Sequence, residues 1–238
     1  MTVLAEIEML LNVYGVKEIS FEDDYLSTDA GRLEAICREA IHRNLRFKWN
    51  TPNGIAIQNL TRPLLRWMIR SGCTRLNFGI ESGDPAILEL MNKKLSLDKI
   101  REVIREAHEE GIVTLGYFVL GVPGETVDSV RRTIDFATSL PLDEIGLFIA
   151  TPFPGTTMTK EAKEKGYLKK EFNTITAEDD IEELVFMETP TMSKEQLADL
   201  KREFFSAFYR KKVWKRPWYF AGRALKQPTL IRRFIWQK

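Results

Sequence analysis

Cysteine and histidine are scarce in this sequence of 238 residues, which contains two of each. Cys37 and Cys73 are too few to form the disulfide framework of a small secreted domain. No cluster of Cys and His has the spacing of a zinc site. A run of about 18 apolar residues is also absent, so the sequence predicts no transmembrane helix.

Several functional signatures are missing as well. The start, MTVLAEIEMLL, lacks the basic segment of a signal peptide, so a cytoplasmic location is the default expectation. Neither the phosphate-binding loop G-x-x-x-x-G-K-S/T nor the dinucleotide fingerprint G-x-G-x-x-G occurs. The composition, 44% hydrophobic and 29% charged, is that of an ordinary globular protein. The absence of these two signatures excludes the phosphate-binding-loop and dinucleotide-fingerprint classes of protein.

Acidic residues are scarce in one region only. Residues 201–238 contain 12 lysines and arginines but a single acid, Glu203, whereas the first 200 residues contain 23 basic and 33 acidic residues. The net charges are therefore +11 and −10. Phe204, Phe205, Phe208 and Tyr209 recur at helical spacing among these basic residues. We expect this tail to dock on the acidic body, with peripheral binding to anionic membrane as the alternative, and we expect no nucleic-acid partner.

The sequence does contain a repeated local pattern. A helix-like stretch, a glycine and an apolar strand-like stretch follow one another at Gly15, Gly72 and Gly111. A glycine at this place is typical of a helix that ends in a left-handed residue. Helices and strands that alternate at this spacing predict βα units and a parallel sheet.

The predicted elements follow from apolar periodicity. Helices are predicted over about 2–14, 30–44, 61–71, 84–91, 98–110 and 126–139, and strands over 17–21, 46–50, 75–80, 113–120 and 143–150. A βα series opens on a strand, whereas this chain opens on a helix, so one strand is expected to be missing at the N-terminal side. Residues 177–186 are acidic and are expected to be partly extended. A long helix is predicted from about 193, with Ser193 as its cap and Gln196 three residues later.

Polar residues and glycines gather where the predicted strands end. In parallel α/β folds the ligand binds at the carboxyl ends of the strands. The alternative is a purely structural role, in which these residues are helix caps or solvated loop residues. The residues that the five strands deliver there are Glu22, Asp23, Asp24, Asn50, Thr51, Glu81, Ser82, Gly121, Gly124, Glu125, Thr151 and Pro152.

Three segments, "FEDD", "GIESGDP" and "FVLGVPGET", stand in an order that resembles the radical S-adenosylmethionine enzymes, in the branch that often carries an N-terminal cobalamin-binding domain. The resemblance implies the α/β class, with a partial (βα)6 TIM-like barrel that lacks its first strand, followed by a helical, basic C-terminal tail. The barrel would cover residues 1–160 and the extension 161–238.

The resemblance also implies the binding residues for S-adenosylmethionine. Glu22, Asp23 and Asp24 would contact the methionyl amino group, and Glu81 and Ser82 the ribose or the methionyl end. The backbone near Gly116, Val119, Gly121 and Glu125 would frame the adenine, and Thr151 and Pro152 would complete that wall. Asn50, at the end of the second predicted strand, completes the candidate set.

One departure from the family is decisive. The family binds a 4Fe-4S cluster through a CxxxCxxC loop after its first strand, and this sequence contains no such loop. The resemblance therefore implies an S-adenosylmethionine-binding barrel that is inactive alone. An N-terminal portion or a separate subunit would supply the cluster loop, and cobalamin would bind in a further domain. The substrate would be a small molecule. The alternatives are a non-catalytic binding module and an unrelated α/β domain.

Overall fold

Helices and strands alternate along the chain as predicted, and the strands form one parallel sheet. The computed structural model describes residues 2–23, 26–169 and 187–215. The strands are β1 (Glu18–Ser20), β2 (Lys48–Ile55), β3 (Cys73–Glu81), β4 (Val113–Leu120) and β5 (Glu144–Ile149). The helices are α1 (Val3–Asn12), α2 (Ala30–His42), α3 (Arg62–Arg70), α4 (Pro85–Leu90), α5 (Leu97–Glu109), α6 (Val127–Ser139), α7 (Thr157–Glu164) and α8 (Lys194–Lys215).

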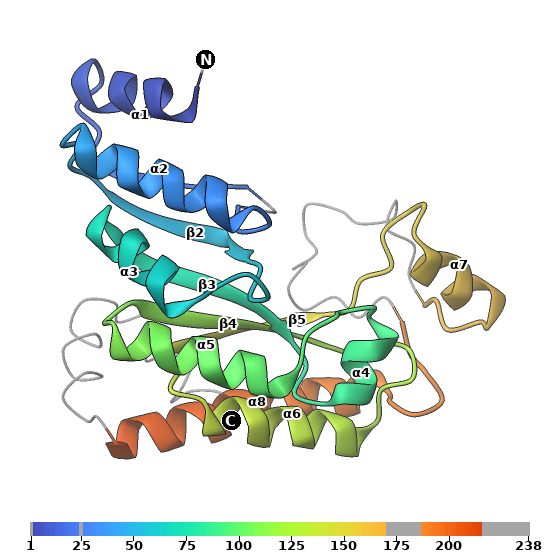
Figure 1. Ribbon diagram of the computed structural model, residues 1–238. Helices are drawn as coiled ribbons and strands as arrows, with labels where there is room; N and C mark the ends of the chain where they lie inside the picture. Colours follow the sequence, from blue (N-terminus) through green and yellow to red (C-terminus); the bar gives the residue numbers. More distant parts are fainter. Residues whose placement is uncertain (1, 24–25, 170–186, 216–238) are drawn as a thin grey trace.

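The five strands lie side by side in chain order, β1-β2-β3-β4-β5, and every neighbouring pair is parallel. Figure 1 shows α2, α3 and α5 along the same face of this curved sheet, with α1 beyond α2 and α8 beside α6. Successive βα units that place their helices on one face curve the sheet into part of a barrel. The predicted partial barrel is confirmed.

Side chains predicted to cap helices do so. The Thr126 hydroxyl accepts from the Ser129 amide while the Ser129 hydroxyl accepts from the Thr126 amide, which is a complete capping box. Ser193 and Gln196 form the same reciprocal arrangement at the start of α8. Each pair satisfies backbone amides that the first helical turn leaves without partners, which explains where these helices begin.

The helices α3 and α5 end as the glycine pattern predicted. Gly72 and Gly111 follow the last helical turns with φ angles of +103° and +87°. Only glycine adopts this left-handed conformation without a steric cost. Each glycine therefore turns the chain directly into the next strand of the sheet.

The main core lies between the sheet and its helices. Leu76, Phe78 and Ile80 occupy alternate positions of β3 and are completely buried on the side of the sheet that faces the helices. α8 adds to this core, because Phe204 is fully buried and its ring lies 5.2 Å from that of Phe118. Alternation along a strand sends the remaining side chains to the opposite face of the sheet.

Some elements differ from the prediction. β2 continues to Ile55 instead of stopping near residue 50, and α7 was not predicted. Residues 177–186 and Asp24 lie outside the described residues.

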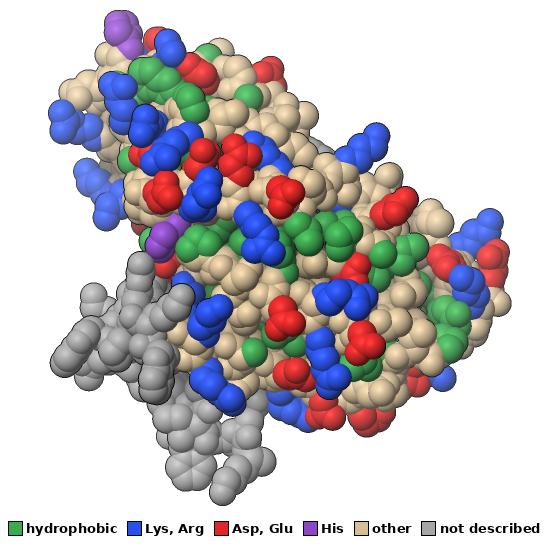
Figure 2. Space-filling model, turned by 60° about the horizontal axis from the view of Figure 1, so that its bottom comes forward, with side chains coloured by type: hydrophobic (Ala, Val, Ile, Leu, Met, Phe, Trp, Pro, Cys, Tyr) green, Lys and Arg blue, Asp and Glu red, His purple; other side chains and the backbone are tan. Residues whose placement is uncertain are grey.

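In the part of the chain that the structure describes, no helix is long and apolar enough to cross a membrane. Figure 2 shows acidic and basic side chains intermixed on the helical face of the molecule, where ion pairs join Arg62 and Arg66 of α3 to Glu110.

Candidate functional site

The sheet face opposite the helices, here called the open face, carries charged and polar side chains and glycines among its apolar residues. The strand register places on it Arg75, Asn77, Gly79, Leu115, Tyr117, Val119, Glu144, Gly146 and Phe148. In a closed barrel this face is the interior. The open face is therefore where a ligand held by the barrel would lie.

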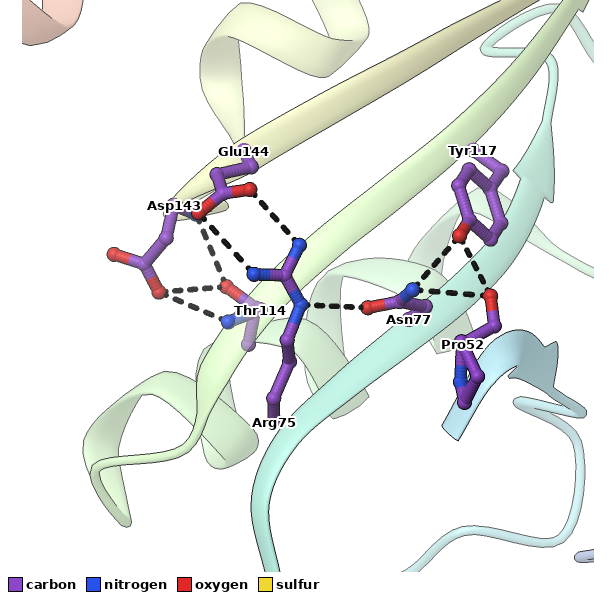
Figure 3. Close-up of polar contacts among 7 residues, drawn as sticks. All are labelled: Pro52, Arg75, Asn77, Thr114, Tyr117, Asp143 and Glu144. Carbon is purple, nitrogen blue, oxygen red and sulfur yellow. Dashed lines mark hydrogen bonds and ion pairs between the residues drawn. The ribbon is translucent and has the colours of Figure 1, made fainter. Parts of the chain in front are cut away.

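An ion pair occupies the open face near the amino-terminal ends of the strands. The Arg75 guanidinium contacts both carboxylate oxygens of Glu144, at 2.8 and 3.4 Å, and its Nε donates to Oδ1 of Asn77 at 3.1 Å. Figure 3 shows Arg75 lying between Glu144 and Asn77, with each polar group of the fork aimed at a partner. This bidentate geometry satisfies the charge where it is partly buried.

Tyr117 lies one step closer to the carboxyl ends of the strands. Its hydroxyl donates to the Pro52 carbonyl at 2.6 Å and accepts from Nδ2 of Asn77 at 2.7 Å. The ring leans on Gly146, where a Cβ atom would come within 2.7 Å of it. Tyr117 therefore reaches from Gly146 of β5 to Pro52 of β2 across the open face, and Figure 3 shows its hydroxyl directed at Asn77 and the Pro52 carbonyl.

At the mouth, Glu81 has a backbone conformation that is rare for its residue type. Its φ angle is +66°, and its Oε1 lies 3.1 Å from the position that a Cβ on Gly79 would take. The absent side chain of Gly79 therefore leaves room for the carboxylate to fold over the open face. Nζ of Lys93, from the loop after α4, lies 2.8 Å from the same oxygen. A strained backbone and a paired charge at a strand end are typical of functional sites.

Lys93 was not predicted as a site residue from the sequence. The only local sequence signal at this position is the basic pair Lys93–Lys94 after α4, and such a pair is typical of a solvated helix end. An open hollow of about 560 Å³ lies between α4 and α5, and Lys93 lines it as well. Lys93 thus stands between that hollow and the mouth of the open face.

The acidic segment after β1 is held by backbone contacts. Glu22 and Asp23 are exposed, and the Glu22 carbonyl accepts from Nδ2 of Asn53 at 2.8 Å. Further along, the Asn59 amide donates to the carbonyls of Ser27 and Thr28. The Glu22 and Asp23 side chains are therefore exposed at the rim, while Asn53 of β2 holds the Glu22 main chain.

The structure places Asn50, Gly116 and Ser82 elsewhere than at the mouth. Asn50 is in the third position of an eight-residue strand and bonds Ser20 and Glu18, so its predicted place at the strand end is wrong. Gly116 faces the helices, because a Cβ there would meet Leu142 and Ile80 at 2.8 and 2.9 Å. Ser82 is fully buried and bonds the Thr133 hydroxyl.

The loop after β4 combines an exposed and a buried part. Val119 is on the open face, and Gly121 ends the strand with φ +82°. Glu125 points inward instead: it is 1% exposed, and burial raises its pKa to about 7. Its Oε2 accepts from the Gly121 amide at 2.6 Å. After β5, the Thr151 hydroxyl donates to the Ile149 carbonyl, and Pro152 is buried. The buried Glu125 side chain thus holds the backbone of the loop after β4 at Gly121.

The two thiols do not fit an iron–sulfur cluster. Cys37 and Cys73 are both buried in the core, and desolvation raises the pKa of Cys37 to about 11 and that of Cys73 still further. Cluster ligands are thiolates, which burial disfavours. Among the described residues, no group of three Cys, His, Asp or Glu could hold a metal ion.

The sequence matches one protein family. Residues 2–137, more than half of the chain, match the model of the Radical SAM superfamily. Over 208 residues the chain is 30% identical to an uncharacterized methyltransferase of Pyrococcus horikoshii, covering 87% of this chain and 44% of that protein. It is 28% identical to the cytidylyl-2-hydroxyethylphosphonate methyltransferase of Streptomyces wedmorensis, covering 71% of this chain and 33% of that enzyme.

Solved structures agree on the fold. The radical S-adenosylmethionine methyltransferase TsrM of Kitasatospora setae, with cobalamin and a 4Fe-4S cluster bound, aligns with a TM-score of 0.62 at 18% identity, covering 82% of this chain and 39% of that one. Coproporphyrinogen III oxidase of Escherichia coli aligns with a TM-score of 0.54 at 15% identity, covering 77% and 37%. The chain thus spans less than half the length of these relatives.

Proposed function

Because the chain belongs to the radical S-adenosylmethionine superfamily, we propose that it is the S-adenosylmethionine-binding part of a radical methyltransferase, completed by a cluster loop that other residues supply. The observation that carries this proposal is the Glu81–Lys93 pair above Gly79 at the end of the central strand. S-Adenosylmethionine carries an ammonium and a carboxylate on one carbon atom. A carboxylate and an ammonium held side by side complement that zwitterion.

The open face suggests how the ligand would lie. Its ammonium would face the carboxylates of Glu81 and of Glu22 or Asp23, and its carboxylate would face Lys93. Charge-assisted hydrogen bonds of this kind are shorter and stronger than neutral ones. The adenosine would then extend along the mouth towards Val119 and Phe148, whose ring is half exposed. Thr151 lies at the end of that path.

The cluster ligands would come from outside the described residues, since the thiols here do not fit. β1 is an edge strand of the sheet, and an edge offers backbone groups that can pair with one more strand. We therefore propose that a preceding segment or a separate subunit adds a strand beside β1 and carries the thiolates. Methyl transfer and a cobalamin cofactor are supported by the names of the relatives, and the acceptor would be a small molecule.

Calorimetric titration of the purified chain with S-adenosylmethionine tests the proposal. We expect measurable binding, which Glu81→Gln and Lys93→Met each weaken by at least about tenfold, since a hydrogen bond to a charged group contributes about 1.5–3 kcal/mol. Glu102→Gln is the matched control, because this exposed residue of α5 pairs only with Lys99 in the described contacts. Absence of binding, or equal affinity in all four proteins, would refute the proposal.

A non-catalytic binding module is the second candidate, favoured by the burial of both thiols. Anaerobic reconstitution with iron and sulfide separates the two. The chain alone should give no stable 4Fe-4S absorbance in either case. Addition of a polypeptide that contains a CxxxCxxC loop and the preceding strand should restore both the cluster and S-adenosylmethionine cleavage only if the chain is part of an enzyme.

A further inference from the structure

The segment Pro52–Gly54 interrupts the regular pairing of β2 with β3. The register shifts between Thr51 and Ile55, and Gly54 has a φ angle of +100°. Such a bulge redirects backbone and side-chain groups, and bulges are frequent beside functional sites. Here the bulge turns the Pro52 carbonyl towards the open face, where two side chains bind it.

These two side chains come from strands further along the sheet. Tyr117 of β4 donates to the Pro52 carbonyl at 2.6 Å, and Asn77 of β3 donates to it at 3.1 Å. The Tyr117 ring has little freedom, because its edge packs on Gly146 and it meets the Phe148 ring at a centroid distance of 5.3 Å. The position of the bulge is therefore fixed by side chains of β3 and β4, and β5 holds the Tyr117 ring.

On its other side the bulge reaches the acidic rim. Asn53, the middle residue of the bulge, donates from Nδ2 to the Glu22 carbonyl at 2.8 Å. The amide of Phe21, one residue earlier, donates to the Asn50 carbonyl at 2.9 Å. The rim segment Glu22–Asp23 is exposed. These two contacts with β2 therefore hold the main chain at the start of the rim segment.

We propose that Tyr117 and Asn53 are positioning residues that act through this bulge to hold the Glu22–Asp23 segment where it receives the ammonium of S-adenosylmethionine. Neither residue needs to touch the ligand. The chain of contacts runs from the Tyr117 hydroxyl to the Pro52 carbonyl, through the Asn53 side chain, to the Glu22 carbonyl. The inference rests on the proposed function for the identity of the ligand.

Binding of two ligands to single variants tests the proposal. Tyr117→Phe removes only the hydroxyl, and Asn53→Ala removes only the contact with the Glu22 carbonyl. Each should weaken S-adenosylmethionine binding about fivefold, the effect of one neutral hydrogen bond. Binding of 5′-methylthioadenosine, which lacks the amino-acid group, should not change. The exposed residues Tyr14 and Asn12 provide matched controls as Tyr14→Phe and Asn12→Ala. Equal losses for the two ligands would overturn the proposal.

The double variant adds a second criterion. Residues that act through one element are not additive, so Tyr117→Phe combined with Asn53→Ala should bind S-adenosylmethionine about as weakly as the weaker single variant. Losses that multiply would mean two independent effects and would contradict the shared bulge.

Amide hydrogen exchange decides the coupling without any ligand. The Phe21 amide should exchange faster in both variants, while the amides of β3 should be unchanged; an unchanged Phe21 amide would overturn the proposal. If the unaltered chain binds 5′-methylthioadenosine but not S-adenosylmethionine, the ammonium role fails. If it binds neither, the proposed function fails as a whole, and the exchange result still supports or refutes the mechanical link from Tyr117 to the rim.

Discussion

The backbone amide of Gly121 donates a 2.6 Å hydrogen bond to Oε2 of Glu125, a carboxyl group that is 1% exposed. The other oxygen, Oε1, is buried without a hydrogen-bond partner among the described residues. Burial raises the pKa of Glu125 to about 7, the backbone hydrogen bonds of Gly121 and Val122 oppose this, and the charge of Asp84 adds to it. The folded chain therefore keeps this carboxyl protonated in mildly acidic solution.

This pair makes stability depend on pH in a definite direction. Between the ordinary pKa of 4.5 and about 7, the native state binds more protons at Glu125 than the unfolded state does. The contribution of Glu125 is therefore fully present below pH 4.5, and the free energy of unfolding falls as pH rises through this window, by about 3 kcal/mol in total. Glu125→Gln should remove this dependence. Urea unfolding at pH 5 and pH 8 should show the variant gaining about 2–3 kcal/mol relative to the original chain.

The comparison between variants isolates Glu125 from the other carboxylates. Glu102→Gln, on the surface of α5, should shift stability equally at both pH values. If Glu125→Gln behaves like Glu102→Gln, the Glu125 carboxyl is ionised in the folded chain and its burial does not control its titration.

Two glycines with similar backbone conformations should differ in their tolerance of alanine. Gly72 and Gly111 both have positive φ angles, so alanine costs about 1 kcal/mol at each. At Gly72 the new Cβ would lie 2.0 Å from the Phe47 carbonyl oxygen, whereas at Gly111 it would meet nothing within 4 Å. Gly72→Ala should therefore lower the free energy of unfolding by at least about 2 kcal/mol more than Gly111→Ala. Equal losses would show that the backbone at Phe47 moves aside freely.

The glycine pattern, the caps and the alternation of helices with strands were predictable because each depends on neighbours in sequence. The end of β2 was not. The strand was predicted over 46–50, and the residues that follow, Pro52 and the pair Asn53–Gly54, are of the kind that forms turns. In the structure they form a bulge within the strand, held by Tyr117 from 65 residues away. A bulge and a turn use the same residues, and only the distant partner decides between them.

The candidate site shows the same division. The strand-end pattern identified Glu81, Glu22 and Asp23 from local sequence. It could not identify Lys93, since the pairing with Glu81 depends on how the loop after α4 folds back over the sheet. It also placed Ser82 beside Glu81 at the mouth, because sequence adjacency does not show that the left-handed Glu81 turns the next residue inward.

The Arg75–Glu144 pair should behave as a coupled unit. Removal of one charge leaves the other partly buried without its partner, so Arg75→Met and Glu144→Gln should each lower the free energy of unfolding by about 1–3 kcal/mol. The double variant should lose less than the sum of the single losses. The exposed pair between Glu39 of α2 and Arg43, the residue that caps this helix, is the control, and its coupling should be much smaller because solvent screens exposed charges. Additive losses at Arg75 and Glu144 would contradict the bidentate contact.

Helix α8 carries two adjacent phenylalanines in different environments. Phe204 is completely buried and packs on Phe118, whereas Phe205 is only partly buried and stacks on Tyr209. Phe204→Ala should therefore lower the free energy of unfolding by about 3–5 kcal/mol, the usual cost of a large cavity. Phe205→Ala should cost about 1 kcal/mol, and urea unfolding of the two variants measures the difference. Similar small losses would mean that α8 is not part of the core, and the basic tail would then be available for the membrane, where liposome flotation would detect it.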